Sequence, residues 1–357
     1  MRRSARVVWC LGLVVALLLS GCAPSLGGRQ STTTHTPAGA HHLVIDISAG
    51  GSGTPHYSIV ALSTRDGSSL WRHPLETPDA LQTAASFGFT PFERDGIVYV
   101  GSYYDSRTVI HRGVLEALDA ASGRLLWRHE TDGILVGTAA VDGSVVYLSS
   151  QAQHAIEPPI VPKAGFVEAL NNRDGSVRWR AKTDGFPGVP SVGDGLVYTL
   201  AHQIPGGTDT GGHLLALNAS DGSPAWKYDS DVPLSMDDSI VNAPLVMNGK
   251  AYIYAVEREP DGVANVALLA IDTRDGTVAW RFKTGGIAGT PAFASNIACV
   301  VTVPSSSAGV GGIVGLDVSD GAPRWSTKMS ASAVGTTMAS RARACCRFSN
   351  CPPNWTM

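Results

Sequence analysis

From about residue 43 to residue 340, short apolar runs alternate with polar turn residues, and no segment keeps the spacing of an amphipathic helix. The runs come in a fixed order. A run that opens on Gly and Thr or Val is followed by a run ending in Tyr, a run opening on Ala-Leu, and a run ending in Trp. In one example the first run covers 137–141, the second 144–147, and the last ends at Trp179. The pattern predicts four short antiparallel strands per period and an all-β fold.

One eleven-residue phrase closes each period and occurs six times, for example ALNNRDGSVRW at 169–179. Each copy ends in Trp and has a Gly four residues earlier, preceded by Asp in five copies and by Ser in one. Asp-Gly between two alternating runs predicts a tight hairpin turn, because Gly accepts positive φ and the Asp side chain forms hydrogen bonds with the nearby backbone of the turn. The tryptophans are Trp71, Trp127, Trp179, Trp226, Trp280 and Trp325, and the turn glycines are Gly67, Gly123, Gly175, Gly222, Gly276 and Gly321.

Such repeats bury their sheets only by packing on one another. Four antiparallel strands per repeat of roughly 50 residues make up a β-propeller blade. A single blade leaves both faces of its sheet open, so neighbouring blades must pack face to face. Each indole ring buries on the order of 200 Å² between two sheets. We therefore assign the six tryptophans to blade docking, in preference to stacking on a ligand.

The first 22 residues have the layout of an export signal. Three arginines within residues 2–6 precede an apolar run over 7–19, which is shorter than the roughly 20 residues of a membrane-spanning helix. The following Ser20-Gly21-Cys22 resembles the end of a bacterial lipobox. That resemblance implies cleavage before Cys22, acylation of its sulfur, and an extracytoplasmic protein held in a bacterial membrane. Plain secretory cleavage is the alternative.

The domain boundaries follow from these patterns. We assign residues 1–21 to the signal peptide, 22–41 to a flexible tether rich in Ser, Thr, Gly and Pro, and 42–341 to the propeller. Residues 342–357 hold three cysteines within seven residues and have the composition of out-of-frame sequence. They are set apart as an atypical tail.

The repeated Ala-Leu-Asp and Gly-x-x-x-Trp elements resemble the pyrroloquinoline-quinone (PQQ)-like repeat of tryptophan-docked propellers, over about residues 43 to 341. With the lipobox, they look most like the propeller lipoproteins of the outer-membrane β-barrel assembly machinery. The resemblance implies a non-catalytic scaffold that binds a protein or peptide partner in the cell envelope. Because other members of the repeat family are quinone-dependent dehydrogenases, a PQQ-dependent oxidoreductase or its degenerate relative is the alternative. A cell-surface ligand sensor is a third.

Six tryptophans predict six blades. Segments 42–48 and 57–63 match the second and third strands of a blade, so the first blade lacks a first strand. Residues 333–339 match that missing strand and predict closure of the ring by the C-terminal segment. Seven- and eight-bladed rings are common in the family that the repeat resembles. A truncated ring of that size therefore stays open as the alternative.

The connections between strands differ in length on the two faces of the predicted propeller. Turns between first and second strands and between third and fourth strands are short and share one face. On the other face we expect long connections, at 103–112, 151–164, 202–212, 257–265 and 304–311 within blades and at 72–90 and 227–244 between blades. Insertions gathered on one face mark a binding surface. We expect a partner to dock there.

No residue is nominated as catalytic. The 27 basic and 30 acidic residues give no electrostatic footprint for nucleic acid, and the ten histidines are dispersed. Asp237, Asp238 and Asn242 offer oxygen ligands that calcium accepts, but a solvated loop is preferred. Cys345-Cys346 resembles the adjacent-cysteine disulfide of some quinone dehydrogenases, yet it lies in the atypical tail. We expect no metal, no cofactor (PQQ and calcium only under the alternative), and a body that depends on no disulfide.

Overall fold

The computed structural model describes residues 43–49, 57–75, 85–86, 91–106, 109–154, 161–203, 211–230, 232, 234, 243–258, 264–285, 291–302 and 311–328. These residues form strands, turns and short connections, without a helix among them. The predicted all-β class is therefore confirmed. The expected signal peptide, tether, closing segment 333–339 and tail lie outside the described residues. Nowhere in the described ranges does a helix occur that is long and apolar enough to cross a membrane.

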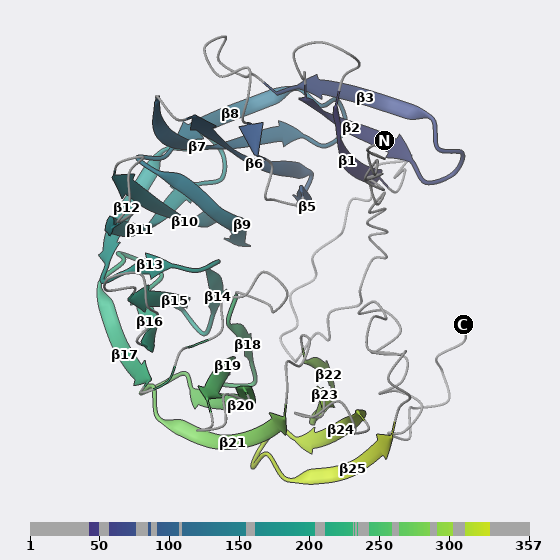
Figure 1. Cartoon of the computed structure of the whole chain (residues 1–357). Coiled ribbons are helices and arrows are strands. Elements are labelled where there is room, and N and C mark those ends of the chain that lie inside the picture. Colours follow the sequence, from purple (N-terminus) through teal and green to yellow (C-terminus); the bar gives the residue numbers. More distant parts are fainter. Residues whose placement is uncertain are drawn as a thin grey trace, which may run out of the picture.

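Six antiparallel sheets follow one another along the chain, and Figure 1 shows them arranged along an arc from β1 to β25. Blade one contains β1 (Leu43–Ala49), β2 (Tyr57–Ser63) and β3 (Ser69–Pro74). Blade two contains β4 (Ala85–Ser86), β5 (Phe92–Arg94), β6 (Ile97–Ser106), β7 (Val109–Asp119) and β8 (Leu125–Glu130). Blade three contains β9 (Ile134–Asp142), β10 (Val145–His154), β11 (Val161–Asn171) and β12 (Val177–Thr183).

Blade four contains β13 (Phe186–Pro187), β14 (Ser191–Gly193), β15 (Leu196–Gln203), β16 (Gly211–Asn218) and β17 (Pro224–Ser230). Blade five contains β18 (Leu245–Met247), β19 (Lys250–Arg258), β20 (Ala264–Asp272) and β21 (Val278–Gly285). Blade six contains β22 (Ala292–Ala294), β23 (Ile297–Thr302), β24 (Gly312–Asp317) and β25 (Pro323–Lys328). The six sheets confirm a propeller with about six blades in this chain.

Blade one begins out of phase, as its sequence predicts. Its order is β1-β2-β3, and β1 pairs with β2 from Leu43↔Ser63 to Ala49↔Tyr57. In blade three the equivalent strands β10 and β11 are preceded by β9, which forms the first strand of the sheet. Within the described residues blade one has no such strand, so β1 forms the edge of its sheet.

The two kinds of short turn differ from each other. Between first and second strands, Asp95 and Gly96 both have positive φ, at 53° and 78°, and form a two-residue hairpin turn. The turn in the repeated phrase is longer than the tight hairpin predicted from Asp-Gly. In blade two the amide of Asp119 donates to the carbonyl of Arg124 at 2.8 Å, which encloses a four-residue loop. Gly123, with φ +69°, is the last residue of that loop and turns the chain into β8.

Several of the expected long loops are extensions of the strands. β6 and β7 stay paired out to Ser106↔Val109, and β10 and β11 stay paired out to His154↔Val161. The segment 103–112 is therefore mostly strand, because its aromatic and β-branched residues favour extended backbone. These hairpins still project on the face predicted to carry the insertions, and their tips lie outside the described residues.

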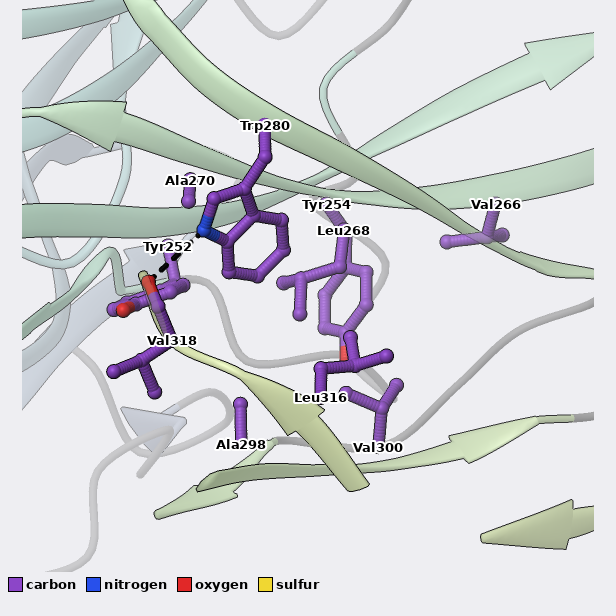
Figure 2. Packing of buried hydrophobic residues seen from close by; sticks show 10 residues of the cluster. All are labelled: Tyr252, Tyr254, Val266, Leu268, Ala270, Trp280, Ala298, Val300, Leu316 and Val318. Carbon is purple, nitrogen blue, oxygen red and sulfur yellow. Dashed lines mark hydrogen bonds between the residues drawn. The ribbon is translucent and has the colours of Figure 1, made fainter. Parts of the chain in front are cut away.

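The hydrophobic core lies between blades. Figure 2 shows the cluster between blades five and six, where Trp280 of β21 points toward Val318, the residue directly after β24. Leu268 of β20 and Leu316 of β24 belong to the same cluster and have no exposed surface. Because each blade buries its side chains against the next, a single blade has no complete core of its own.

Candidate binding surface

Five of the six repeated tryptophans make the same hydrogen bond to the next blade. The indole Nε1–H of Trp71 donates to the carbonyl of Ala120, the fourth residue of the following phrase, at 2.9 Å. The other four bonds measure 2.8 to 3.0 Å and join Trp127 to Asn172, Trp179 to Ala219, Trp226 to Thr273 and Trp280 to Val318. The tryptophans therefore dock each blade on its neighbour as well as filling space.

The turn glycine of each following blade receives the indole ring. A Cβ on Gly123 would lie 2.5 Å from Cε3 of Trp71, closer than carbon atoms approach. The same arrangement joins Gly175 to Trp127, Gly222 to Trp179, Gly276 to Trp226, and Gly321 to Trp280. Gly67 of blade one has φ +72° but nothing within 4 Å of the added Cβ. The structure thus brings five tryptophan–glycine pairs together, and it does not bring Trp325 to Gly67.

A tyrosine on the second strand completes the packing in four blades. Tyr99, Tyr147, Tyr198 and Tyr252 are buried, and their rings lie 5.7 to 6.1 Å from the rings of Trp127, Trp179, Trp226 and Trp280. Burial raises the pKa of Tyr99, Tyr198 and Tyr252 to about 12. The recurring Tyr was visible in the sequence as the end of a run, but its partner was not, because the two residues lie 28 positions apart in three blades and 32 apart in the fourth.

Charged side chains are buried in the first two junctions between blades. Glu168 of β11 is 4% exposed, and its carboxylate lies 3.1 Å from Nε2 of His129 in blade two and 3.2 Å from Nε of Arg180 in its own blade. One junction earlier, Glu116 of β7 lies 3.5 Å from both His73 of blade one and Arg128. These networks were not predicted, because His, Glu and Arg in single copies along strands resemble ordinary exposed residues.

The equivalent positions in later junctions are apolar. Tyr228 of β17 and Leu269 of β20 share a cluster between blades four and five. Phe282 of β21 and Val314 of β24 share the cluster between blades five and six. The blades are therefore joined by two kinds of contact, ionic near the N-terminal end of the series and hydrophobic near the C-terminal end.

We call the side that carries the β6–β7, β10–β11, β15–β16 and β19–β20 hairpin ends the hairpin face, and the side with the short turns the turn face. The last strand of each blade runs from the turn face to the hairpin face. Its final residues there include exposed cations, such as Arg180, Lys182 and Lys227. Arg180 lies over the ring of Phe166 at 3.7 Å and pairs with Asp132 at 2.5 Å. Lys227 pairs with Asp229 at 2.9 Å.

The turn face carries repeated aspartates that cap the backbone. Asp174 Oδ1 accepts the backbone N–H of Ser176 at 3.0 Å and its hydroxyl at 2.6 Å, and Asp221 is bonded in the same way to Ser223. These bonds from serine lower the pKa of both carboxyls. Since each aspartate is occupied with its own turn, the turn face has fewer side chains available to a partner.

The residues considered for cofactor chemistry lie outside the described part of the chain. This applies to Asp237, Asp238 and Asn242, to Cys345-Cys346, and to Cys22, the expected site of lipid attachment. Among the described residues, no three His, Cys, Asp or Glu side chains come together in a group that could hold a metal ion.

The expectation that the body depends on no disulfide is wrong. Cys299 of β23 is disulfide-bonded and 5% exposed. The other five cysteines of the chain are all outside the described residues, so its partner is among them. Sequence spacing did not reveal this bond, because a disulfide requires two cysteines to be close in space, and spacing along the chain does not show that distance.

The comparison with known families matches two segments of the chain. The family described as "Outer membrane protein assembly factor BamB" matches residues 56–157 and 163–345. The outer membrane protein assembly factor BamB of Yersinia pestis is 28% identical over 191 residues, covering 50% of this chain and 41% of the relative. That of Nitrosomonas eutropha is 26% identical over 273 residues, covering 75% of this chain and 54% of the relative. The chain thus spans about half the length of these curated relatives.

Among solved structures, the quinohemoprotein alcohol dehydrogenase of Comamonas testosteroni is similar with a TM-score of 0.51. It is 12% identical, and the similarity covers 77% of this chain and 58% of that chain. At this identity the likeness shows a shared propeller fold and carries no information on activity.

Proposed function

We propose, on the premise that the chain belongs to the family of the outer membrane protein assembly factor BamB, that it is a protein-binding propeller of the cell envelope. In this proposal it acts without catalysis, as a scaffold in the assembly of outer membrane proteins. The observation that carries the proposal is the family match, which runs through all six blades.

The hairpin face is the proposed docking surface. Strand extensions in blades two to five lengthen the hairpins on this side, whereas the turns on the opposite side are short and occupied with their own capping bonds. The exposed cations at the ends of the last strands favour a partner segment that carries carboxylates. Rigid blades beneath the hairpins would hold these groups in fixed positions, which lowers the entropy lost on binding.

Affinity capture tests this proposal with a matched pair of variants. A tagged full-length chain extracted from membranes should retain an envelope protein in stoichiometric amount. Lys182→Glu combined with Lys283→Glu reverses two exposed charges at the hairpin-face ends of β12 and β21. We expect the captured amount to fall about tenfold, which corresponds to about 1.4 kcal/mol of binding free energy.

The control reverses two charges on the other side. Arg65→Glu combined with Arg173→Glu changes exposed residues in the turns of blades one and three. This control should capture as much partner as the unchanged chain. Equal loss in both pairs would mean that the partner does not select the hairpin face, and failure to capture any stoichiometric protein would overturn the scaffold function.

The oxidoreductase alternative makes a different prediction. A ligand at 100 times its dissociation constant stabilises its protein by about 2.7 kcal/mol. If the chain is a non-catalytic scaffold, adding pyrroloquinoline quinone and calcium to the purified protein should leave its thermal midpoint unchanged. A rise in the midpoint together with a change in quinone absorbance would support the oxidoreductase.

Lipid attachment at Cys22 is proposed as the means of anchoring. We expect cells fed a radioactive fatty acid to label the chain, and Cys22→Ser to abolish the label and release the protein from the membrane fraction. Cys10→Ser is the matched control, because Cys10 lies within the expected signal peptide and should leave labelling unchanged. Labelling that survives Cys22→Ser would place the lipid elsewhere.

A further inference from the structure

The first two junctions between blades differ from a later one at a single buried position. Glu116 and Glu168 stand one residue before the residue that opens the repeated phrase, and each carboxylate lies between a His of the preceding blade and an Arg of its own blade. Between blades four and five the equivalent residue is Leu269, which packs in one cluster with Tyr228. Charge is therefore buried in the first two junctions where the later junction buries hydrocarbon.

A second position divides the junctions in the same way. Ser150 of β10 lies two residues beyond Leu148, which pairs with Glu168, so Ser150 lies on the face of the sheet that carries the glutamate. Ser102 of β6 is its equivalent in blade two, and Ala255 of β19 is its equivalent in blade five. All three residues are buried. Each ionic junction thus adds a buried hydroxyl to its buried carboxylate.

Two of these polar atoms have no hydrogen-bond partner among the described residues, namely Oε2 of Glu116 and Oγ of Ser150. Nε2 of His73 lies 3.5 Å from Oε2 of Glu116, which is long for a hydrogen bond. A buried polar atom without a partner raises the free energy of the folded state, and water removes that cost when the atom becomes exposed. Separating two apolar blades has the opposite effect, because it exposes hydrocarbon to water. The ionic junctions therefore open at lower cost.

The docking tryptophan and the ionic residues lie in different halves of a junction. Trp127 donates to the carbonyl of Asn172 in blade three, and its ring lies against Gly175 in the turn of that blade. His129 follows two residues later on β8, toward the hairpin face, and meets Glu168 there. The blades are thus docked near the turn face and joined through charge nearer the hairpin face.

We propose that the propeller flexes at its first two junctions, where blades one, two and three separate toward the hairpin face and stay hinged at the tryptophan–glycine contacts. A buried ion pair is often no more stable than the apolar packing that could replace it, so the charged residues make these junctions separable. Moving elements of proteins are drawn from such regions of low local stability. In the open state the β6–β7 and β10–β11 hairpins lie further apart. This inference does not depend on the partner of the hairpin face.

Thiol labelling of the full-length protein tests the proposal. Ser102→Cys and Ser150→Cys place a thiol in the two ionic junctions, and Ala255→Cys places the matched control in the apolar junction; their tryptic peptides contain no native cysteine. When opening is fast relative to alkylation, the rate of labelling by iodoacetamide follows the population of the open state. We expect both serine positions to be labelled about tenfold faster than the control, which corresponds to about 1.4 kcal/mol in the cost of opening. Equal rates at all three positions would overturn the proposal.

An exchange of the buried residues tests the cause. His129→Tyr combined with Glu168→Leu copies the apolar pair found between blades four and five. Added to Ser150→Cys, this exchange should slow labelling to the rate of the control, while Ser102→Cys with the same exchange keeps its fast rate. Unchanged labelling of Ser150→Cys in a protein that keeps its strands by circular dichroism would exclude the ion network as the cause. If the exchange prevents folding, the comparison of the three single thiols still decides the proposal.

A fourth thiol tests the hinge. Val146 lies on β10 nearer the turn face, has no exposed surface, and packs in the cluster that contains Trp127. Because the tryptophan–glycine contact stays closed, Val146→Cys should be labelled as slowly as the apolar control, although it lies on the same strand as Ser150. Labelling of Val146→Cys as fast as Ser150→Cys would show that the blades separate along their whole length and would overturn the hinge.

Discussion

At each described blade junction an indole ring lies against a glycine, and this contact explains why Gly stands at the same place in five of the six copies of the phrase. Positive φ alone would permit Asn or Asp at some cost. The ring leaves no room for any Cβ at Gly123, Gly175, Gly222, Gly276 or Gly321. Conformation and packing therefore act together at these five positions, whereas at Gly67 only conformation acts.

This difference predicts unequal costs for the same substitution. Gly222→Ala would place a Cβ 2.5 Å from Cε3 of Trp179, at φ +74°. Gly67→Ala has nearly the same φ, +72°, and open space. Both should lose about 1 to 2 kcal/mol from the left-handed backbone, and Gly222→Ala should lose a further 1 to 3 kcal/mol, roughly, from overpacking. Urea unfolding measures both values, and equal losses would contradict the role of the ring contact.

Between the second and third blades, the joining element is a buried ion network. Glu168 lies between His129 of blade two and Arg180 of its own blade, while Asp132 holds the other side of Arg180. A buried carboxylate with two partners is costly to neutralise, because the groups that face it lose the charge they are paired with. Exposed pairs behave differently, since water screens them.

Glu168→Gln and Glu130→Gln form a matched pair for this junction. Glu168→Gln should lower the free energy of unfolding by about 1.5 to 3 kcal/mol, because it removes charge-assisted hydrogen bonds in a buried site. Glu130 pairs with Arg112 at 2.9 Å but its side chain is 46% exposed, so Glu130→Gln should cost less than about 1 kcal/mol. Chemical denaturation of the two variants separates these outcomes, and a larger loss from Glu130→Gln would exclude the buried network as the main ionic contact.

Across the whole molecule, the turn face supplies a shared dependence on pH. Five aspartates in the turns have a carboxyl pKa lowered from 3.8 by hydrogen bonds from Ser or Thr; they are Asp119, Asp174, Asp221, Asp275 and Asp317. The pKa of Asp317 falls to about 2. A carboxyl with a lower pKa in the folded state stabilises that state above its unfolded pKa. This contribution is lost as the pH falls through the folded value.

We therefore expect resistance to urea to decline as the pH falls from about 4 toward 2. Asp221→Asn keeps an oxygen that accepts the bonds from Ser223 but cannot titrate, so it should reduce the slope of stability against pH in this range. Unfolding midpoints collected between pH 5 and pH 2 show the trend. An unchanged slope in the variant would remove Asp221 from the set of responsible groups.

Local patterns in the sequence were sufficient for the architecture. The alternation of apolar residues, the turn glycines and the recurring tryptophan determined the all-β class, the six sheets and the out-of-phase start at β1. These features are local or repeated, so a single chain reveals them without knowledge of contacts. The phrase also located the docking tryptophans, because a repeated large ring in a stacked fold has few other places to lie.

Tertiary structure alone decided which side chains meet. The partners of Trp71 and Trp127 are glycines 52 and 48 residues further along the chain, and Glu168 meets a histidine of the preceding blade. The alternation of apolar and polar residues along one strand does not indicate which side chains of the adjacent blade will contact it. Neither the ionic contacts between blades nor the disulfide bond of Cys299 could therefore be anticipated. Packing between sheets converts isolated residues into pairs, and only the folded chain specifies those pairs.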